Sequence, residues 1–289
     1  MSRIRCKSGI RIRLTLIICA DKKVIRRTGT VLFLVLHVAM WAVAQQNLFN
    51  VPSSDITIKG KPFFQQQINV PRNGHLLLTS TFSYGLGFNA EVGLNVIGLE
   101  IASQNGALGV VSNADPSRPP LYPFFTINAQ KAFVLSPMFK VSIGTQAGFA
   151  PGMQYGSFSY LNMVTAIPQI HAKVVTGLNH GTDSFLGPGD RNPVFFTTYD
   201  PVGYQLGLEQ ELIREILLLQ VEHISGSHNL GVSVLGLGVH LSEHWVISAG
   251  YQFSSHGNPT PNSLVFEFTY VPSVISHRRI YHEGHPEID

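Results

Sequence analysis

The feature that most constrains this chain is an alternation of apolar and polar residues with a period of two. The alternation recurs in several segments between Tyr204 and Tyr270, separated by short polar connectors. In the last segment, residues 264–270, the apolar face consists of Leu264, Phe266, Phe268 and Tyr270. Successive side chains of a strand point to opposite faces, so this period predicts antiparallel strands with one apolar face each.

Residues 139–149 repeat the pattern in the N-terminal half and indicate what the apolar face contacts. This face begins at Phe139 and ends at Phe149. Ten residues at about 3.3 Å each, tilted by about 45°, project to roughly 23 Å. Transmembrane β-barrels have an apolar band about 25 Å tall between two aromatic girdles. A soluble β-sandwich also alternates, but it has no reason to place aromatic residues at this spacing. The strand therefore favours a barrel.

Counting such segments back from Tyr270 gives about twelve strands, and bacterial single-chain barrels carry an even number. The connectors also fall into two groups, one at each end, as in these barrels. The short turns are residues 85–87, 136–137, 168, 214–215 and 242–244. The other group comprises residues 71–74, 103–121, 150–155, 179–192, 225–230 and 254–262. We predict an all-β fold, an antiparallel up-and-down transmembrane β-barrel of about 12 strands over residues 63–270.

Three segments fit this pattern less cleanly. Residues 231–241 carry apolar side chains in both phases, which suggests a β-bulge. Residues 209–219 can also be read as an amphipathic helix, although the phase of the neighbouring strands favours a strand. Residues 193–200 are expected to extend the next strand, with a kink at Asp200-Pro201.

The N-terminus has the features of a signal peptide. A basic region is followed by the apolar run 31–40, and Ala42 and Ala44 fit the small-x-small rule for cleavage after Ala44. The alternative is a membrane anchor, but the apolar stretch of 14 residues from 31 to 44 is short of the roughly 20 that a spanning helix needs. Residues 1–44 are therefore predicted to be removed.

Removal of this leader changes the charge of the chain. The leader holds 9 of the 20 Lys and Arg residues and 1 of the 17 Asp and Glu residues, so the remainder carries 11 basic and 16 acidic residues. No basic footprint for nucleic acid remains. Cys6 and Cys19 also leave with the leader, so disulfides cannot hold the mature chain together.

The two ends of the mature chain lack strand periodicity. Residues 45–62 are interpreted as a periplasmic lead-in with a turn near Pro52. Residues 271–289 form a predicted periplasmic polar tail, because Pro272 cannot lie in a central strand.

With its leader, alternating strands and aromatic last strand, the chain resembles porin-like outer-membrane β-barrel proteins of Gram-negative bacteria. The resemblance implies location in the outer membrane, contact with its lipids and insertion by the barrel assembly machinery. It also implies passive diffusion of small solutes through a polar lumen, without a cofactor. Members of this class usually stop at the terminal aromatic residue, whereas 19 residues follow Tyr270.

Charged residues on the inward phase of the strands suggest two opposite readings of the lumen. They could line an open pore and select ions, or they could form an interior network that fills the barrel. The residues concerned are Glu91, Lys140, His171, Lys173, Glu209, Glu211, Glu222 and Glu267.

A different class of function is suggested by His223 and Ser225 at the loop end of a strand. A His two residues from a Ser on the outer wall resembles the arrangement in outer-membrane phospholipase and lipid A deacylase, where His acts as general base. Asn229 or Asp200 would be the third group. Short motifs of this kind often occur by chance, so this lipid hydrolase is an alternative and we expect no enzyme activity.

Other sites find less support. The tail residues His277, His282, Glu283, His285 and Glu287 match no zinc spacing. Gly231, Gly236 and Gly238 open no helix and so form no phosphate-binding loop. We therefore expect no catalytic, cofactor-binding or metal-binding residues, and a third possibility is a non-transporting barrel with adhesive or structural loops.

Overall fold

A computed structural model of the chain describes residues 47–104, 107–189 and 202–272. The predicted signal peptide, the strand extension at 193–200 and the tail beyond 272 lie outside these residues. The described strands are β1 (Pro62–Pro71), β2 (Leu76–Gly87), β3 (Ala90–Gln104), β4 (Ala107–Val111), β5 (Phe124–Ser136), β6 (Phe139–Ala150), β7 (Gln154–Ile167), β8 (Ala172–Gly181), β9 (Val202–Ile213), β10 (Leu217–Ile224), β11 (Val232–His240), β12 (Trp245–Ser254) and β13 (Ser263–Tyr270). Two short helices, η1 (Pro168–Ile170) and α2 (Asp183–Leu186), lie between strands.

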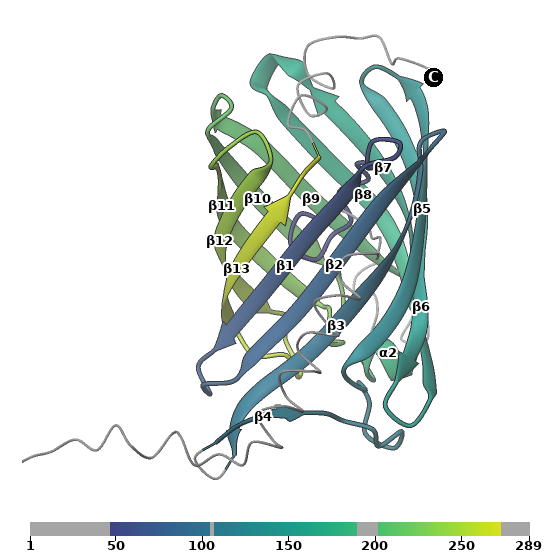
Figure 1. Ribbon diagram of the computed structural model, residues 1–289, viewed down its shortest axis with the longest axis vertical. Helices are drawn as coiled ribbons and strands as arrows, with labels where there is room; N and C mark the ends of the chain where they lie inside the picture. Colours follow the sequence, from purple (N-terminus) through teal and green to yellow (C-terminus); the bar gives the residue numbers. More distant parts are fainter. Residues whose placement is uncertain (1–46, 105–106, 190–201, 273–289) are drawn as a thin grey trace, which may run out of the picture. The chain divides into compact units, whose positions relative to one another are not determined.

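Twelve of these strands form one closed antiparallel barrel (Figure 1). Neighbours in the barrel follow the order of the chain, with β3 pairing directly to β5. The ring closes where β1 pairs with β13, Phe64 lying opposite Tyr270. The prediction of an all-β, antiparallel barrel of about 12 strands is confirmed.

β4 lies outside the closed ring. It pairs with the last five residues of β3, from Glu100 to Gln104, and forms a hairpin that extends this strand beyond the barrel. The sequence predicted a plain loop over residues 103–121, because the short β4 segment carries too few alternating residues to stand out from its polar surroundings.

The connectors sort as the sequence predicted. One end of the barrel, called the turn end, carries residues 88–89, 137–138, 168–171, 214–216 and 241–244. The opposite end, called the loop end, carries the long connections and α2, together with two short turns at residues 72–75 and 151–153. The turn between β2 and β3 is formed by Phe88 and Asn89 rather than by residues 85–87, and both have positive φ, as a type I′ turn requires.

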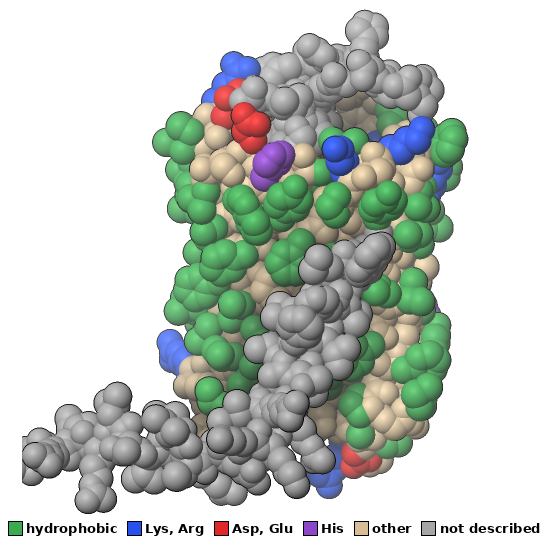
Figure 2. Space-filling view, in the orientation of Figure 1, with side chains coloured by type: hydrophobic (Ala, Val, Ile, Leu, Met, Phe, Trp, Pro, Cys, Tyr) green, Lys and Arg blue, Asp and Glu red, His purple; other side chains and the backbone are tan. Residues whose placement is uncertain are grey.

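The alternation corresponds to an outer and an inner face. On β6, Phe139, Ile143 and Phe149 are 43%, 54% and 45% exposed, whereas the intervening Ser142 is fully buried. Figure 2 shows hydrophobic side chains spread over the outer wall, with charged side chains toward its two ends. Polar side chains thus point inward and apolar ones outward, the reverse of a soluble protein and the arrangement expected in lipid.

Two of the irregular segments are regular in the structure. Residues 209–219 form the end of β9, a turn at residues 214–216 and the start of β10, so the strand interpretation is confirmed over the helix. The bulge predicted in residues 231–241 is wrong, because β11 pairs with β10 and β12 in continuous register. Apolar residues occupy both phases there because the inward Val232 and Val234 pack against Phe49.

Within the described ranges, no helix combines the length and the apolar character needed to cross a membrane.

The outward face of β6 gives a test of the membrane-facing wall. Replacing Ile143 with Arg near the middle of the strand should destabilise the folded barrel in lipid by about 2–4 kcal/mol, because a guanidinium at mid-bilayer depth is poorly solvated. Leu135→Arg, at the turn end of β5, is the matched control and should cost only about 0–1 kcal/mol. Urea titration of folding into lipid vesicles measures both, and equal costs would contradict a lipid-facing band.

Candidate functional site

The lumen of the barrel contains part of the chain's own N-terminal segment. Residues 47–58, called the plug, precede β1 and appear as the purple coil within the barrel in Figure 1. Leu48, Phe49 and Val51 are each at most 1% exposed, and Ser54 is fully buried. The lead-in at residues 45–62 was expected in the periplasm, but the part of it that forms the plug lies inside the barrel.

Glu222 on β10 is the most extensively bonded anchor of the plug. Its carboxylate accepts hydrogen bonds from three successive backbone N–H groups, those of Phe49 at 3.1 Å, Asn50 at 2.9 Å and Val51 at 2.9 Å. The Asn50 side-chain amide donates a fourth, at 2.7 Å. Hydrogen bonds to an ionised group are shorter and stronger than neutral ones. They satisfy a carboxylate that is only 2% exposed.

Three apolar side chains of the plug occupy matching positions on the inner wall. Leu48 and Val51 pack with three inward residues of β7, β8 and β10, which are Val164, Val175 and Ile224. Phe49 packs with Val232, Val234 and Val265. A Cβ at Gly236 would lie 2.6 Å from the Phe49 ring, so a side chain at this position would displace the phenyl group.

Asp55 links the plug to two lysines of the opposite wall. Its carboxylate lies 2.6 Å from Lys140 Nζ and 2.6 Å from Lys173 Nζ. Lys173 also pairs with Glu209 at 3.2 Å. Lys173 is 1% exposed and Asp55 5%. Buried charges of this kind are stable only when paired, so loss of either partner would leave an expensive unpaired ion.

Neutral hydrogen bonds continue the contact down the lumen. Ser142 Oγ donates to Ser54 Oγ at 2.6 Å, and Asn162 Nδ2 donates to the Pro52 carbonyl at 3.0 Å. Near the turn end, Thr57 N donates to Glu91 at 2.6 Å. The plug therefore has partners on several strands around the barrel.

The plug leaves the lumen at the turn end against a glycine. A Cβ at Gly85 would lie 2.2 Å from the carbonyl oxygens of Thr57 and Ile58, closer than any side chain allows. The backbone of Lys59 then forms an isolated parallel β-bridge with Gly85, and β1 begins at Pro62. Gly85 thus fixes where the chain passes from the lumen into the wall.

The inward charges predicted from sequence are largely brought together by these contacts. Glu91, Lys140, Lys173, Glu209, Glu222 and Glu267 all belong to inward positions of the strands. Two residues are exceptions. His171 follows η1 in a turn with φ of 49°, and Glu211 is only half-buried near the end of β9. Of the two readings of the lumen, the interior network describes this arrangement. The plug residues were missed because they have no periodic pattern.

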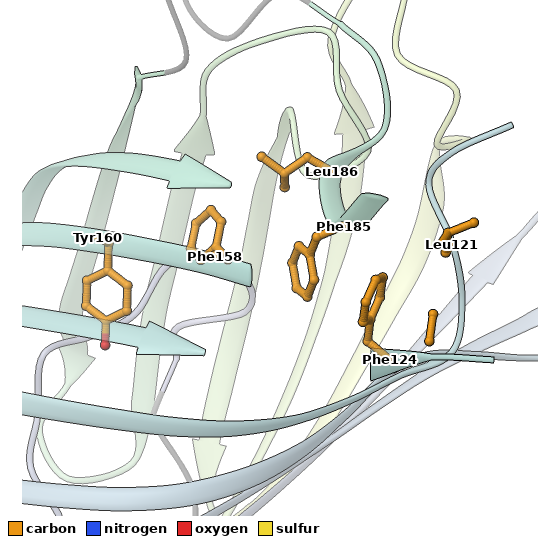
Figure 3. Packing of buried hydrophobic residues seen from close by; sticks show 7 residues of the cluster. Leu121, Phe124, Phe158, Tyr160, Phe185 and Leu186 are labelled. Atoms are coloured by element: carbon orange, nitrogen blue, oxygen red, sulfur yellow. The ribbon is translucent and has the colours of Figure 1, made fainter. Parts of the chain in front are cut away.

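A second group of side chains fills the loop end. The connection between β8 and β9 folds inward as α2, which inserts Phe185 between Phe124 and Phe158 (Figure 3). Their ring centroids lie 5.0 Å and 6.2 Å from that of Phe185. Leu230 packs against both this aromatic cap and the apolar group that holds Leu48. The cap and the plug therefore meet inside the barrel.

His223 and Ser225 have different surroundings from those hypothesised. β10 ends at Ile224, so the alternation stops and Ser225 is buried, its Oγ accepting a hydrogen bond from Tyr204 N at 2.8 Å. His223 Nδ1 lies 2.9 Å from Ser233 Oγ on β11. Asn229 accepts a hydrogen bond from Thr260, and Asp200 lies outside the described residues. The hydroxyl beside His223 is thus Ser233, which sequence spacing could not indicate.

A closed twelve-stranded barrel with an apolar outer wall and a polar interior defines the chain as a β-barrel of the outer-membrane type. It is similar to the β-domain of the Bordetella autotransporter BrkA, at 12% identity over 72% of this chain and 98% of that one, with a TM-score of 0.36. LpxR from Salmonella typhimurium matches at 10% identity over 73% and 100%, with a TM-score of 0.36. The outer-membrane channel DcaP of Acinetobacter baumannii matches at 10% over 75% and 99%, with a TM-score of 0.28.

No protein-family model and no curated protein matches the sequence. At these identities and TM-scores, the similarities to solved structures carry no argument about this chain.

Glu222 should control how firmly the plug is seated. In a Val51→Cys background of residues 45–289, a polar thiol reagent should react slowly, because residue 51 is buried and this part of the chain contains no other cysteine. Adding Glu222→Ala removes the acceptor of four N–H donors and should speed labelling about tenfold to a hundredfold, each tenfold corresponding to about 1.4 kcal/mol. Glu100→Ala, which removes a partner of His75, is the control and should leave the rate unchanged.

Proposed function

We propose that the protein is an outer-membrane channel for small solutes whose lumen is closed at rest by its own N-terminal plug. It would reside among outer-membrane lipids after insertion by the barrel assembly machinery. The observation that carries this proposal is the binding of the plug backbone by Glu222 in the middle of a barrel wide enough to admit a polypeptide. Barrels of eight strands are filled by side chains alone, whereas larger ones enclose space.

The way the plug is attached supports release without unfolding. Every strand of the barrel is paired with two neighbours, and none of these ladders includes residues 47–58. The plug is held by hydrogen bonds, by the ion pairs of Asp55 and by three apolar side chains. Its covalent connection to the wall runs through residues 59–61, which precede β1. Departure of the plug would leave the aromatic cap of α2 at the loop end as the remaining insertion. Passive diffusion through the polar lumen, as the sequence predicted for an unobstructed barrel, would therefore also require this cap to shift.

Conductance in a planar bilayer tests the proposal. The mature chain, residues 45–289, should be closed for most of the recording, whereas deletion of residues 45–57 should give stable discrete conductance steps. A synthetic peptide of residues 45–58 added to the deletion variant should restore the block, because it supplies the groups that Glu222 and the two lysines bind.

A reversible lock in the full-length chain gives the control. Ser54→Cys combined with Ser142→Cys places two thiols where the hydroxyls now lie 2.6 Å apart, and no native cysteine competes in the mature chain. The oxidised protein should never open, and reduction should return the openings of the parent. A folded deletion variant that conducts nothing would instead point to a barrel without a transport role.

One observation favours a second candidate, the lipid hydrolase. The contact between His223 Nδ1 and Ser233 Oγ would let His223 act as general base for a serine nucleophile on the outer wall. If so, Ser233→Ala should abolish hydrolysis of phospholipid or lipid A esters by the refolded protein, and Ser225→Ala should leave it intact. Absence of ester hydrolysis by the parent protein would eliminate this candidate and leave the channel untouched.

A further inference from the structure

Three buried oxygens on the inner wall between β10 and β13 have no hydrogen-bond partner among the described residues. They are Gln220 Oε1, Ser248 Oγ and Glu267 Oε2. Their residues are 5%, 1% and 2% exposed. Nearly all buried polar atoms in folded proteins are satisfied, so three unsatisfied oxygens in one stretch of wall require an explanation.

Two of the oxygens approach the same glycine. A Cβ at Gly238 would lie 3.0 Å from Ser248 Oγ and 3.2 Å from Gln220 Oε1, so both oxygens lie close to this point of the inner wall. Ser248 lies directly opposite Gly238 on one side and directly opposite Glu267 on the other. Directly opposed residues have Cβ atoms only about 4.5–5.5 Å apart. Glu267 therefore lines the same part of the wall.

The chemistry of this group selects the kind of ligand. A glutamine amide oxygen and a carboxylate oxygen only accept hydrogen bonds, so their partner must donate or be positively charged. Calcium takes six to eight oxygen ligands and usually several carboxylates, whereas this group offers one carboxylate and two neutral oxygens.

We propose that Glu267, Ser248 and Gln220 form a binding subsite for a small monovalent cation, an alkali ion or ammonium, inside the lumen. The site lies beside the part of the wall that Phe49 covers at Gly236, so the cation would sit next to the seated plug. The proposal depends on the barrel and its side chains, and it holds whether or not the lumen conducts.

Thermal unfolding of the full mature protein in detergent tests the site. At constant ionic strength, replacing N-methyl-D-glucamine chloride with NaCl, KCl or NH4Cl should raise Tm by a few degrees and then saturate, because a ligand that binds only the folded state stabilises it. N-methyl-D-glucamine serves as the reference because it is a bulky organic cation that oxygen ligands cannot enclose as they do an alkali ion. The preferred ion is the one with the lowest half-saturation concentration.

Two variants test the site in different ways. Glu267→Gln removes the charge and keeps the shape, and Gly238→Ala places a methyl group against Ser248 Oγ and Gln220 Oε1 without changing any charge. Each should abolish the saturable rise in Tm. Glu91→Gln is the matched control, since this buried lumen carboxylate binds Thr57 on another part of the wall, and it should keep the rise.

Two results would overturn the proposal. No cation-dependent rise in the parent protein would mean that the three oxygens bind solvent only. A rise retained in both Glu267→Gln and Gly238→Ala would place the cation elsewhere. If one of these variants fails to fold, Ser248→Ala takes its place, because it removes a ligand with little change in volume. None of these Tm measurements uses conductance, so their outcome is independent of the channel proposal.

Discussion

Closure of the hydrogen-bond ladder between β1 and β13 is the constraint on which the rest of this structure depends. Lipid offers no partners for backbone N–H and C=O groups, so a sheet can face it only if no edge is left unpaired. With Phe64 opposite Tyr270, the first and last strands of the chain satisfy each other. The outer wall can then be largely apolar, and most polar side chains of the strands turn to the interior.

A twelve-stranded ring creates an interior that its own side chains do not fill. The chain solves this with two insertions, the plug before β1 and the aromatic cap of α2. The plug also solves an electrostatic difficulty, because the buried lysines at 140 and 173 need a counter-charge and Asp55 supplies it. Glu222 in turn needs hydrogen-bond donors, and three backbone N–H groups of the plug provide them. Filling and charge balance are therefore achieved by the same twelve residues.

Several features of the site followed from local pattern and several did not. The inward positions of Glu222 and Lys173 could be predicted, because the phase of a strand is set by neighbours two residues away. The valines at 232 and 234 looked like a bulge, since nothing nearby in sequence indicated that Phe49 would cover them. The pairing of His223 with Ser233 was hidden for a similar reason, because it depends on the register between β10 and β11.

The alternation in the sequence indicated the twelve strands of the ring, their faces and most turns, because these rest on side chains and turn residues only a few positions apart, whereas the short β4 escaped it. Only the tertiary structure decided what occupies the lumen. The plug meets Glu222 across 171 to 173 residues of chain, and such a contact leaves no periodic signal in either segment. A segment without periodicity can lie in solvent or inside a barrel. The difference is set by whether the surrounding wall presents the acceptors, counter-charges and apolar surfaces that its backbone and side chains require.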